Sequence, residues 1–460
     1  MPDSSYDCVV IGSGPGGYVA AIRAAQLGMK TAVVEKDEVG GRCLNYACIP
    51  AKAVLRAADV KTEAEGGSAL GIVAENVSVD FGGVVGHRDK VIKTLTGGVA
   101  GLFKKNKIDL IEGFGALTED ANVRIGAAKD GDEIEAGKII LATGSVPKPL
   151  LGLKFGGRVH STETMWAIGE MPKRLAVIGA GASGTEVASA FGRLGAEVVL
   201  LEALDQILPL EDEEISKACA REIKKQNVEI LTGVKIESAE AGDAEVRLTY
   251  GGEEHAFDQL CIAAGRGPDV EDLGLADAKV RTDDGGLVDV DDRLRTSREG
   301  VYAIGDMVRG PALAHKASDE GVIAAEDAAG QETHPIDYRF VPAATFCHPQ
   351  VASFGMTEKE ARDEGRDVVV GKVPISAVGA PTVYGDRTGM IKIVGDAEYG
   401  ELLGGHIVCA KAADLISELV VARDLEGGYS EVARSIHPHP AFPEAVMEAA
   451  RAADGWLIHG

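Results

Sequence analysis

The sequence has no long apolar run and an excess of acidic over basic residues. No segment reaches the roughly 20 consecutive apolar residues that a membrane-spanning helix needs, so we expect no membrane anchor. The 47 lysines and arginines are outnumbered by 72 aspartates and glutamates, which gives a formal net charge of −25. Such a surface repels nucleic acids and anionic membranes, and neither is an expected partner.

Aromatic residues and cysteines are also scarce. Aromatic residues make up 5% of the 460 residues, whereas glycine occurs 59 times, a balance that suits an α/β protein of two to four domains with tight turns. The acidic start of the chain, MPDSSYD, has no pattern of a targeting peptide. Five of the seven cysteines are scattered along the chain and form no close pair. This pattern fits the cytoplasm, where thiols stay reduced, better than secretion, so we expect a cytoplasmic location and buried thiols at these five positions. These are Cys8, Cys219, Cys261, Cys347 and Cys409.

The other two cysteines, Cys43 and Cys48, stand in the segment GGRCLNYACIPAK, which ends at Lys52. Pro50 suits the first turn of a helix and residues 51–58 are good helix formers, so we expect Cys48 at a helix N-terminus. The helix dipole and the cation of Lys52 would both lower a thiol pKa there. A structural zinc site would need more ligands, and a static disulfide would close too small a loop to stabilise much. The third alternative is a redox-active dithiol. The spacing of the two cysteines alone is only moderately specific evidence for it.

A dinucleotide-binding pattern occurs twice in the chain. An apolar strand over residues 6–11 is followed by a glycine-rich turn, a helix and a second strand that ends at Glu35. The same order recurs from a strand over residues 174–178, at a constant offset of 167 residues, and ends at Glu202. The glycines let a pyrophosphate approach a helix N-terminus, and the carboxylate binds ribose hydroxyls. We therefore expect two dinucleotide sites, one with Gly12, Gly14 and Gly17 and the other with Gly179, Gly181 and Gly184.

Three further strands end in candidate binding residues. Expected strands over residues 138–142 and 259–264 lead into glycine turns. A third strand, from Val301, ends near Asp306, ahead of a helix start at Ala314. Asp306 suits binding of a ligand hydroxyl, and a helix or turn cap is the other role that the local sequence allows. The turn residues are Thr143, Gly144, Ser145 and Gly265.

From about residue 339 the pattern changes to an α+β type without a glycine fingerprint. The segment SIHPHPAFPE, ahead of the last expected helix, contains His437, His439 and Glu444. It could be a surface loop, half of a metal site, or a histidine base oriented by a carboxylate. We expect strands over residues 341–354, 367–374, 389–394 and 401–408, and helices over residues 411–423 and 441–453.

These motifs resemble those of the pyridine nucleotide-disulfide oxidoreductases, and within that family those of the dihydrolipoamide dehydrogenases. The segment GGRCLNYACIPAK matches the signature G-G-x-C-x-x-x-x-C-x-P-x-K, and six motifs follow the family order over nearly the whole chain. The resemblance implies an α/β fold with two Rossmann-like dinucleotide-binding domains and a C-terminal α+β dimerisation domain. The implied domains are FAD-binding (1–148), NAD-binding (149–270), central and completing the FAD site (271–338), and dimer-interface (339–460).

The resemblance also assigns roles to single residues. Cys43 would exchange with the substrate, and Cys48 would lie against the flavin. His439, held by Glu444, would be the base and would come from the other subunit of a homodimer, whereas His437 has no partner at that spacing. FAD would be bound by Gly12, Gly14, Gly17, Glu35, Lys52, Gly115, Thr143, Gly144, Ser145, Asp306 and Ala314, and NAD by Gly179, Gly181, Gly184, Glu186, Glu202 and Gly265.

The activity that the resemblance implies is oxidation of protein-bound dihydrolipoamide with reduction of NAD, through a disulfide between the paired cysteines and FAD. Lipoyl domains of 2-oxo acid dehydrogenase complexes would be the partners, no metal would be needed, and Lys52 would pair with Glu186. Another reductase of the family is one alternative, although Glu202 and Asp205 disfavour the 2′-phosphate of NADPH. A non-catalytic flavoprotein subunit is the other. Departures from the family pattern at Arg42, Ala47 and Ala51 remove no reacting atom.

Overall fold

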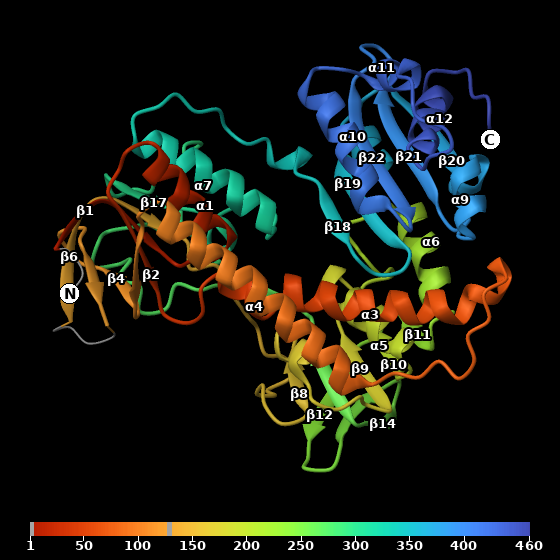
Figure 1. Ribbon diagram of the computed structural model, residues 1–460, viewed down its shortest axis with the longest axis horizontal. Helices are drawn as coiled ribbons and strands as arrows, with labels where there is room; N and C mark the ends of the chain where they lie inside the picture. Colours follow the sequence, from red (N-terminus) through yellow and green to blue (C-terminus); the bar gives the residue numbers. More distant parts are fainter. Residues whose placement is uncertain (1–3, 127–130) are drawn as a thin grey trace. The chain divides into compact units, whose positions relative to one another are not determined.

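A computed structural model describes residues 4–126 and 131–460 of the chain. The first three residues of MPDSSYD, where no targeting signal was expected, lie outside these ranges. The chain forms two compact units (Figure 1). The first comprises Met1–Pro50, Gly86–Lys148 and Gly265–Tyr338, and the second Ala51–Val85, Pro149–Ala264 and Arg339–Gly460. Helices α3 (Cys48–Gly66) and α4 (Phe81–Lys105) each begin in one unit and end in the other.

The main sheet of the first unit is mixed. Its order is β3-β2-β1-β6-β5-β4, with β17 also paired with β6. The ladders among β3, β2, β1, β6 and β17 are parallel, and those of β4 and β5 are antiparallel. The strands are β1 (Ser5–Ile11), β2 (Thr31–Glu35), β3 (Asp109–Glu112), β4 (Gly115–Leu117), β5 (Val123–Ile125), β6 (Asp132–Leu141) and β17 (Val301–Ala303), and a separate antiparallel pair consists of β7 (Ser145–Pro147) and β16 (Arg266–Pro268).

Helices α1 (Pro15–Gln26) and α7 (Ala314–Ala328) pack side by side in the first unit (Figure 1). Small residues permit this approach, since a Cβ on Gly16 would lie 2.9 Å from the carbonyl oxygen of Ala317. Apolar residues of α1, α7 and the parallel strands form one buried core. The short helix α2 (Gly41–Asn45) follows β2, and the 3₁₀ turn η3 (Gly305–Met307) follows β17.

The second unit contains a parallel sheet in the order β11-β10-β9-β15-β8. Hydrophobic residues of these strands are buried, as in sheets covered on both faces. Its elements are β8 (Val159–Ser161), β9 (Arg174–Ile178), α5 (Ala182–Leu194), β10 (Glu197–Leu201), α6 (Glu213–Ile223), β11 (Val228–Leu231) and β15 (Gln259–Ile262). An antiparallel meander adds β12 (Ile236–Ala241), β13 (Val246–Tyr250) and β14 (Glu253–Phe257).

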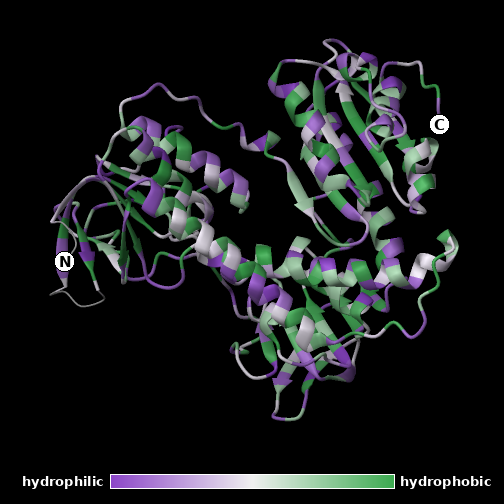
Figure 2. Cartoon of the chain, viewed as in Figure 1, coloured by the Kyte–Doolittle hydropathy of each residue, from purple (hydrophilic) through white to green (hydrophobic). Residues whose placement is uncertain are grey.

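The second unit also contains an antiparallel sheet in the order β18-β19-β22-β21-β20. Figure 2 shows its central strands as predominantly hydrophobic, and they pack with α10 and α12 into a buried core. In the described part of the chain, no helix combines the length and the apolar character needed to cross a membrane. The elements are β18 (Ala343–Thr345), β19 (Gln350–Gly355), α8 (Glu358–Asp363), β20 (Val368–Pro374), α9 (Gly379–Tyr384), β21 (Met390–Asp396), β22 (Leu402–Cys409), α10 (Ala412–Asp424), α11 (Tyr429–Arg434) and α12 (Glu444–Ala453).

The structure confirms both predicted strand-helix-strand repeats and the helix that follows Cys48. Several predicted boundaries were wrong, among them the following three. The strand expected over 138–142 starts earlier, at Asp132, because it also pairs with β5. The region 341–354, expected as one strand, forms two strands, β18 and β19. The last helix, expected from residue 441, starts at Glu444 because Pro440 and Pro443 delay its start. Helix α4 and the meander were not predicted.

Candidate active site

The paired cysteines lie next to the first glycine-rich turn. Helix α2 contains Cys43, and α3 starts at Cys48, so the predicted helix N-terminus is present. Both cysteines are half-buried. Gly41 has φ +57°, and a Cβ there would lie 2.7 Å from the Cα atom of Gly14, so only glycine permits this close approach. The segment with the two thiols is thereby packed against the first fingerprint.

The first fingerprint has the shape of a phosphate-binding turn. Gly12 has φ +100°, and a Cβ on Gly17 would overlap the carbonyl oxygen of Gly12. Beside Gly14, in contrast, a Cβ would meet no atom of the described chain within 4 Å, so the turn leaves room for a ligand. Glu35 is buried and accepts hydrogen bonds from the amide of Ser13 at 2.8 Å and from its hydroxyl at 2.6 Å. No side chain caps α1, so its first amides can bind an anion.

The second fingerprint, in the second unit, repeats this geometry. Gly179 has φ +97°, and a Cβ on Gly184 would overlap the carbonyl oxygen of Gly179. The space beside Gly181 is open among the described residues, as it is beside the equivalent glycine of the first turn. Glu202 accepts a hydrogen bond from the amide of Ala180 at 2.7 Å. Helix α5 has no capping side chain, so this turn also fits a dinucleotide pyrophosphate.

The predicted residues after β6 and β17 meet in the first unit. The hydroxyl of Ser145 donates to Oδ2 of Asp306 at 2.6 Å and accepts from Nε of Arg266 at 2.9 Å. Within the described ranges, Oδ1 of Asp306 accepts no hydrogen bond, so it can bind a ligand hydroxyl. Ala314 is the first residue of α7, whose cap residue Leu313 offers no capping side chain. Backbone amides at that helix end are therefore available for a ligand.

The other predicted positions in the first unit shape the turns. The hydroxyl of Thr143 donates to the carbonyl oxygen of Asp269 at 2.6 Å, and Gly144 accepts from the amide of Asp269 at 2.9 Å. Gly115 is buried in β4, where a Cβ would lie 3.0 Å from Val34 Cγ1. Gly265 has φ +121° and accepts from the amide of Lys148 at 3.2 Å. These residues hold backbone geometry rather than present side chains.

Lys52 and Glu186 form the predicted pair in the second unit. The ammonium nitrogen of Lys52 lies 2.9 Å and 3.0 Å from the two carboxylate oxygens of Glu186. Phe346, which was not predicted, contacts both partners, since its amide donates to Glu186 at 2.9 Å and its ring centre lies 4.6 Å from the Lys52 nitrogen. The pair is thus fixed in one orientation by a residue that directly follows β18.

The two histidines of the loop before α12 have different partners. Nδ1 of His439 lies 2.9 Å from Oε1 of Glu444, and the side chain of His439 is 75% exposed. No carboxylate was expected at the five-residue spacing from His437, but the structure gives it a distant one, since its Nε2 lies 2.5 Å from Oε1 of Glu418, 19 residues earlier. Glu418 comes from α10, so spacing along the loop could not reveal it. The side chain of His437 is only 7% exposed.

The pKa values of His437 and Glu444 both depart from their ordinary values. Hydrogen bonding to Glu418 raises the pKa of His437 above its ordinary value, despite the opposing effect of burial. Burial alone would raise the pKa of Glu444, but the amide of Ala441 and the ring of His439 outweigh it and lower that pKa. Glu444 therefore stays ionised and can orient His439, whose Nε2 points away from the hydrogen bond.

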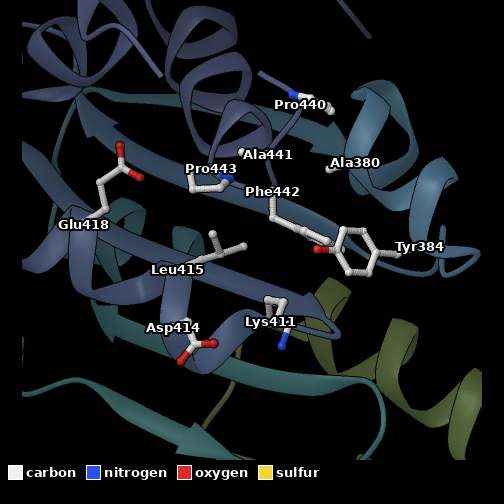
Figure 3. A pocket seen from close by; sticks show the side chains of 10 residues that line it. All are labelled: Ala380, Tyr384, Lys411, Asp414, Leu415, Glu418, Pro440, Ala441, Phe442 and Pro443. Carbon is white, nitrogen blue, oxygen red and sulfur yellow. The ribbon is translucent and has the colours of Figure 1, made fainter. Parts of the chain in front are cut away.

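A pocket of about 390 Å³ adjoins this loop (Figure 3). The rings of Tyr384 and Phe442 line it together in an edge-to-face contact, with centres 5.5 Å apart and planes inclined by 63°. Asp414 and Glu418 border it from α10, and Lys411 borders it from the position just before that helix. In the described residues, no group of three or more histidine, cysteine or acidic side chains is arranged to hold a metal ion.

Known proteins match nearly the whole chain. Residues 6–321 match the pyridine nucleotide-disulphide oxidoreductase family model, and residues 341–450 match the dimerisation domain of the same family. A dihydrolipoyl dehydrogenase of Thermus scotoductus is 43% identical over 462 residues, covering 99% of each chain. One of Bacillus subtilis is 43% identical over 460 residues, covering 98% of this chain and 97% of the relative.

Solved structures give the same result. LpdA from Mycobacterium tuberculosis has a TM-score of 0.89 at 26% identity, over 96% of this chain and 99% of its own. The HOCl-induced flavoprotein disulfide reductase RclA from Escherichia coli has a TM-score of 0.86 at 27% identity, over 96% of this chain and 98% of its own. With both domain matches and full-length relatives in agreement, the chain belongs to the pyridine nucleotide-disulphide oxidoreductase family.

Proposed function

We propose that this chain is an FAD-containing dihydrolipoyl dehydrogenase that oxidises protein-bound dihydrolipoamide with NAD. The net reaction turns dihydrolipoamide and NAD⁺ into lipoamide, NADH and a proton. The observation that carries the proposal is the packing of the two-cysteine segment on the first fingerprint, through Gly41 and Gly14. It brings a thiol pair next to a turn that fits a dinucleotide. The names of the 43% identical relatives support the choice of substrate.

The chain's own groups carry the thiol chemistry in this proposal. One substrate thiolate attacks the sulfur of Cys43, which breaks a Cys43–Cys48 disulfide and forms a mixed disulfide. The second substrate thiolate then attacks the substrate sulfur, closes lipoamide and releases Cys43 as a thiolate. Nε2 of His439 accepts a substrate proton, because Glu444 holds Nδ1. FAD, when bound, supplies the two-electron carrier between the reduced cysteines and the nicotinamide.

The cofactors divide between the two fingerprints. FAD is assigned to the first, with Glu35, Asp306 and Ala314, because these residues share one unit with the cysteines. NAD is assigned to the second, with Glu202. The assignment of Lys52 to FAD rests on the resemblance of its segment to the family signature. Within the second unit, its ammonium is fixed by Glu186 and Phe346. The four-domain division at residues 148, 270 and 338 belongs to the same proposal.

A homodimer is part of the proposal. Residues 341–450 match a dimerisation domain, and His439 is 75% exposed, as expected of a base that serves a second copy of the chain. Lipoyl domains of 2-oxo acid dehydrogenase complexes are the proposed partners. The five scattered cysteines are buried thiols, which supports a cytoplasmic location.

The test is a substrate panel. The purified protein is first analysed for released FAD, and NADH or NADPH formation is then measured with dihydrolipoamide or reduced glutathione. We expect one FAD per chain and turnover with dihydrolipoamide and NAD that exceeds every other combination. Absence of FAD, or equal rates with glutathione, would contradict the proposal.

A further inference from the structure

A buried ion pair in the first unit has no part in the proposed reaction. Nζ of Lys316 lies 3.1 Å from Oε1 of Glu320, and both side chains are 0% exposed. The two residues are one turn apart on α7, so they share a face of that helix. The helix begins shortly after Asp306, to which the FAD site was assigned.

The pair binds both backbone groups of one residue, Gly305. Nζ of Lys316 donates to the carbonyl oxygen of Gly305 at 2.8 Å. The amide of Gly305 donates to Oε2 of Glu320 at 2.7 Å. The carbonyl belongs to the peptide bond that joins Gly305 to Asp306, and Gly305 has φ +79°. The two charges thus fix the backbone immediately before Asp306.

Tyr338 closes the network from the other side. Its hydroxyl donates to Oε1 of Glu320 at 2.7 Å, and its ring centre lies 5.6 Å from the Lys316 nitrogen. A Cβ on Gly310 would lie 2.6 Å from a carbon of the Tyr338 ring, so the ring packs on the loop that leads to α7. Glu320 therefore has three partners, and each of them borders the segment that contains Asp306.

Stability does not explain why this pair is charged. Burial lowers the pKa of Lys316 and raises the pKa of Glu320, so dehydration opposes both charges. Buried ion pairs are often no more stabilising than well-packed apolar residues. What apolar side chains cannot do is bind the amide and the carbonyl of Gly305.

We propose that Lys316 and Glu320 are positioning residues that hold the Gly305 backbone and thereby aim Asp306 at a hydroxyl of FAD. The proposal rests on the proposed function only in that Asp306 binds FAD. Ser145 holds Oδ2 of Asp306, so the orientation of Oδ1, the oxygen that would bind the ligand hydroxyl, is fixed as well.

The first test compares two double variants of the holoenzyme. Lys316→Met with Glu320→Gln removes the charges together, so that no lone charge is left buried. The control, Arg295→Met with Asp327→Asn, removes the contact of 2.6 Å between Nε of Arg295 and Oδ2 of Asp327, near the other end of α7. The side chain of Asp327 is also nearly buried, at 2% exposed. Dissociation of FAD is followed by the fluorescence of released flavin, and unfolding by urea.

We expect the first double variant to bind FAD about tenfold or more weakly, since hydrogen bonds to charged groups are lost. The control should lose stability while its FAD dissociation constant stays within about twofold. Equal loss of FAD in both would overturn the proposal, because the pair would then act only through stability. Wild-type protein without FAD would instead refute the proposed function.

A double-mutant cycle tests whether the pair acts through Asp306. In an Asp306→Ala background, the Lys316→Met and Glu320→Gln changes should alter the FAD dissociation constant by less than about threefold. The full effect in that background would contradict the proposal. If the double variant does not fold, Tyr338→Phe takes its place in the cycle, because this change removes only the hydroxyl that donates to Glu320. A smaller weakening that vanishes with Asp306→Ala is then expected, and no weakening would overturn the proposal.

Discussion

The carboxylates of Glu35 and Glu202 make the same two backbone contacts, 167 residues apart in the sequence. Glu35 accepts from the amide of Ser13 at 2.8 Å, and Glu202 from the amide of Ala180 at 2.7 Å. Each also accepts, at 2.9 Å, from the amide two residues after itself. Both carboxylates are therefore fixed at a strand end beside a glycine-rich turn. A fixed carboxylate can accept hydrogen bonds from ribose hydroxyls and repels a phosphate there.

Cofactor choice follows from this arrangement. With Glu202 in place, NAD should be preferred over NADP by at least about tenfold in kcat/KM, or about 1.4 kcal/mol. Glu202→Ala should weaken NAD use and reduce that preference. The measurement is steady-state turnover with each nucleotide at saturating dihydrolipoamide. Equal use of the two nucleotides by the wild-type protein would refute the role of Glu202.

The base can be identified with a matched pair of variants. His439→Gln should lower turnover by roughly 10² to 10⁴, the usual range for general acid-base catalysis, while FAD stays bound. His437→Gln should retain most of the activity, because His437 is nearly buried and held by Glu418. If His437→Gln is the more damaging change, the two histidines have been assigned the wrong roles.

Mixed dimers test whether the base acts across subunits. Cys48→Ser and His439→Gln proteins are each expected to be nearly inactive alone. If His439 serves the partner's disulfide, a mixed dimer has both defects in one site and leaves the other intact, so activity should return on mixing. If each histidine serves its own chain, the mixture stays inactive. Subunit exchange is checked independently with differently tagged chains.

The His437–Glu418 contact predicts a pH-dependent stability. Because the contact raises the pKa of His437, its stabilisation is complete below the ordinary value of 6.5 and disappears as pH rises through the raised value. The difference in unfolding free energy between wild-type and His437→Gln proteins should therefore be larger at about pH 6 than at about pH 9. Urea unfolding at both pH values measures it, and a constant difference would exclude this ionic contribution.

Features whose geometry depends on residues close together in the sequence could be predicted from the sequence. The fingerprints could be predicted because only glycine tolerates the φ of Gly12 and Gly179, and because the repeat has a constant offset. The contact between His439 and Glu444 was predicted because the two residues are only five positions apart, across a short turn before a helix. Helix α4 was missed since glycines disfavour helix by about 1 kcal/mol each. It contains Gly82, Gly83, Gly86, Gly97, Gly98 and Gly101.

Contacts between distant elements could not be predicted from local patterns, and the Lys52–Glu186 pair was expected only from the family resemblance. Glu418 reaches His437 from α10, and Phe346 reaches Lys52 and Glu186 from the end of β18. Their positions depend on how helices pack on sheets, which the periodicity of one segment does not specify. Lys316 and Glu320 were not singled out from the sequence, because their four-residue spacing is that of an ordinary helical pair and their burial follows only from the packing of α7.

The central claim is that substrate electrons enter at Cys43 and Cys48, and thiol mapping tests it most directly. Oxidised protein is treated anaerobically with one equivalent of dihydrolipoamide, quenched with iodoacetamide and digested, and alkylated peptides are identified by mass spectrometry. We predict no label at either cysteine before reduction and label at Cys43 ahead of Cys48 afterwards, because Cys43 is the exchanging thiol. Label that is independent of dihydrolipoamide, or that appears at other cysteines instead, would contradict the account.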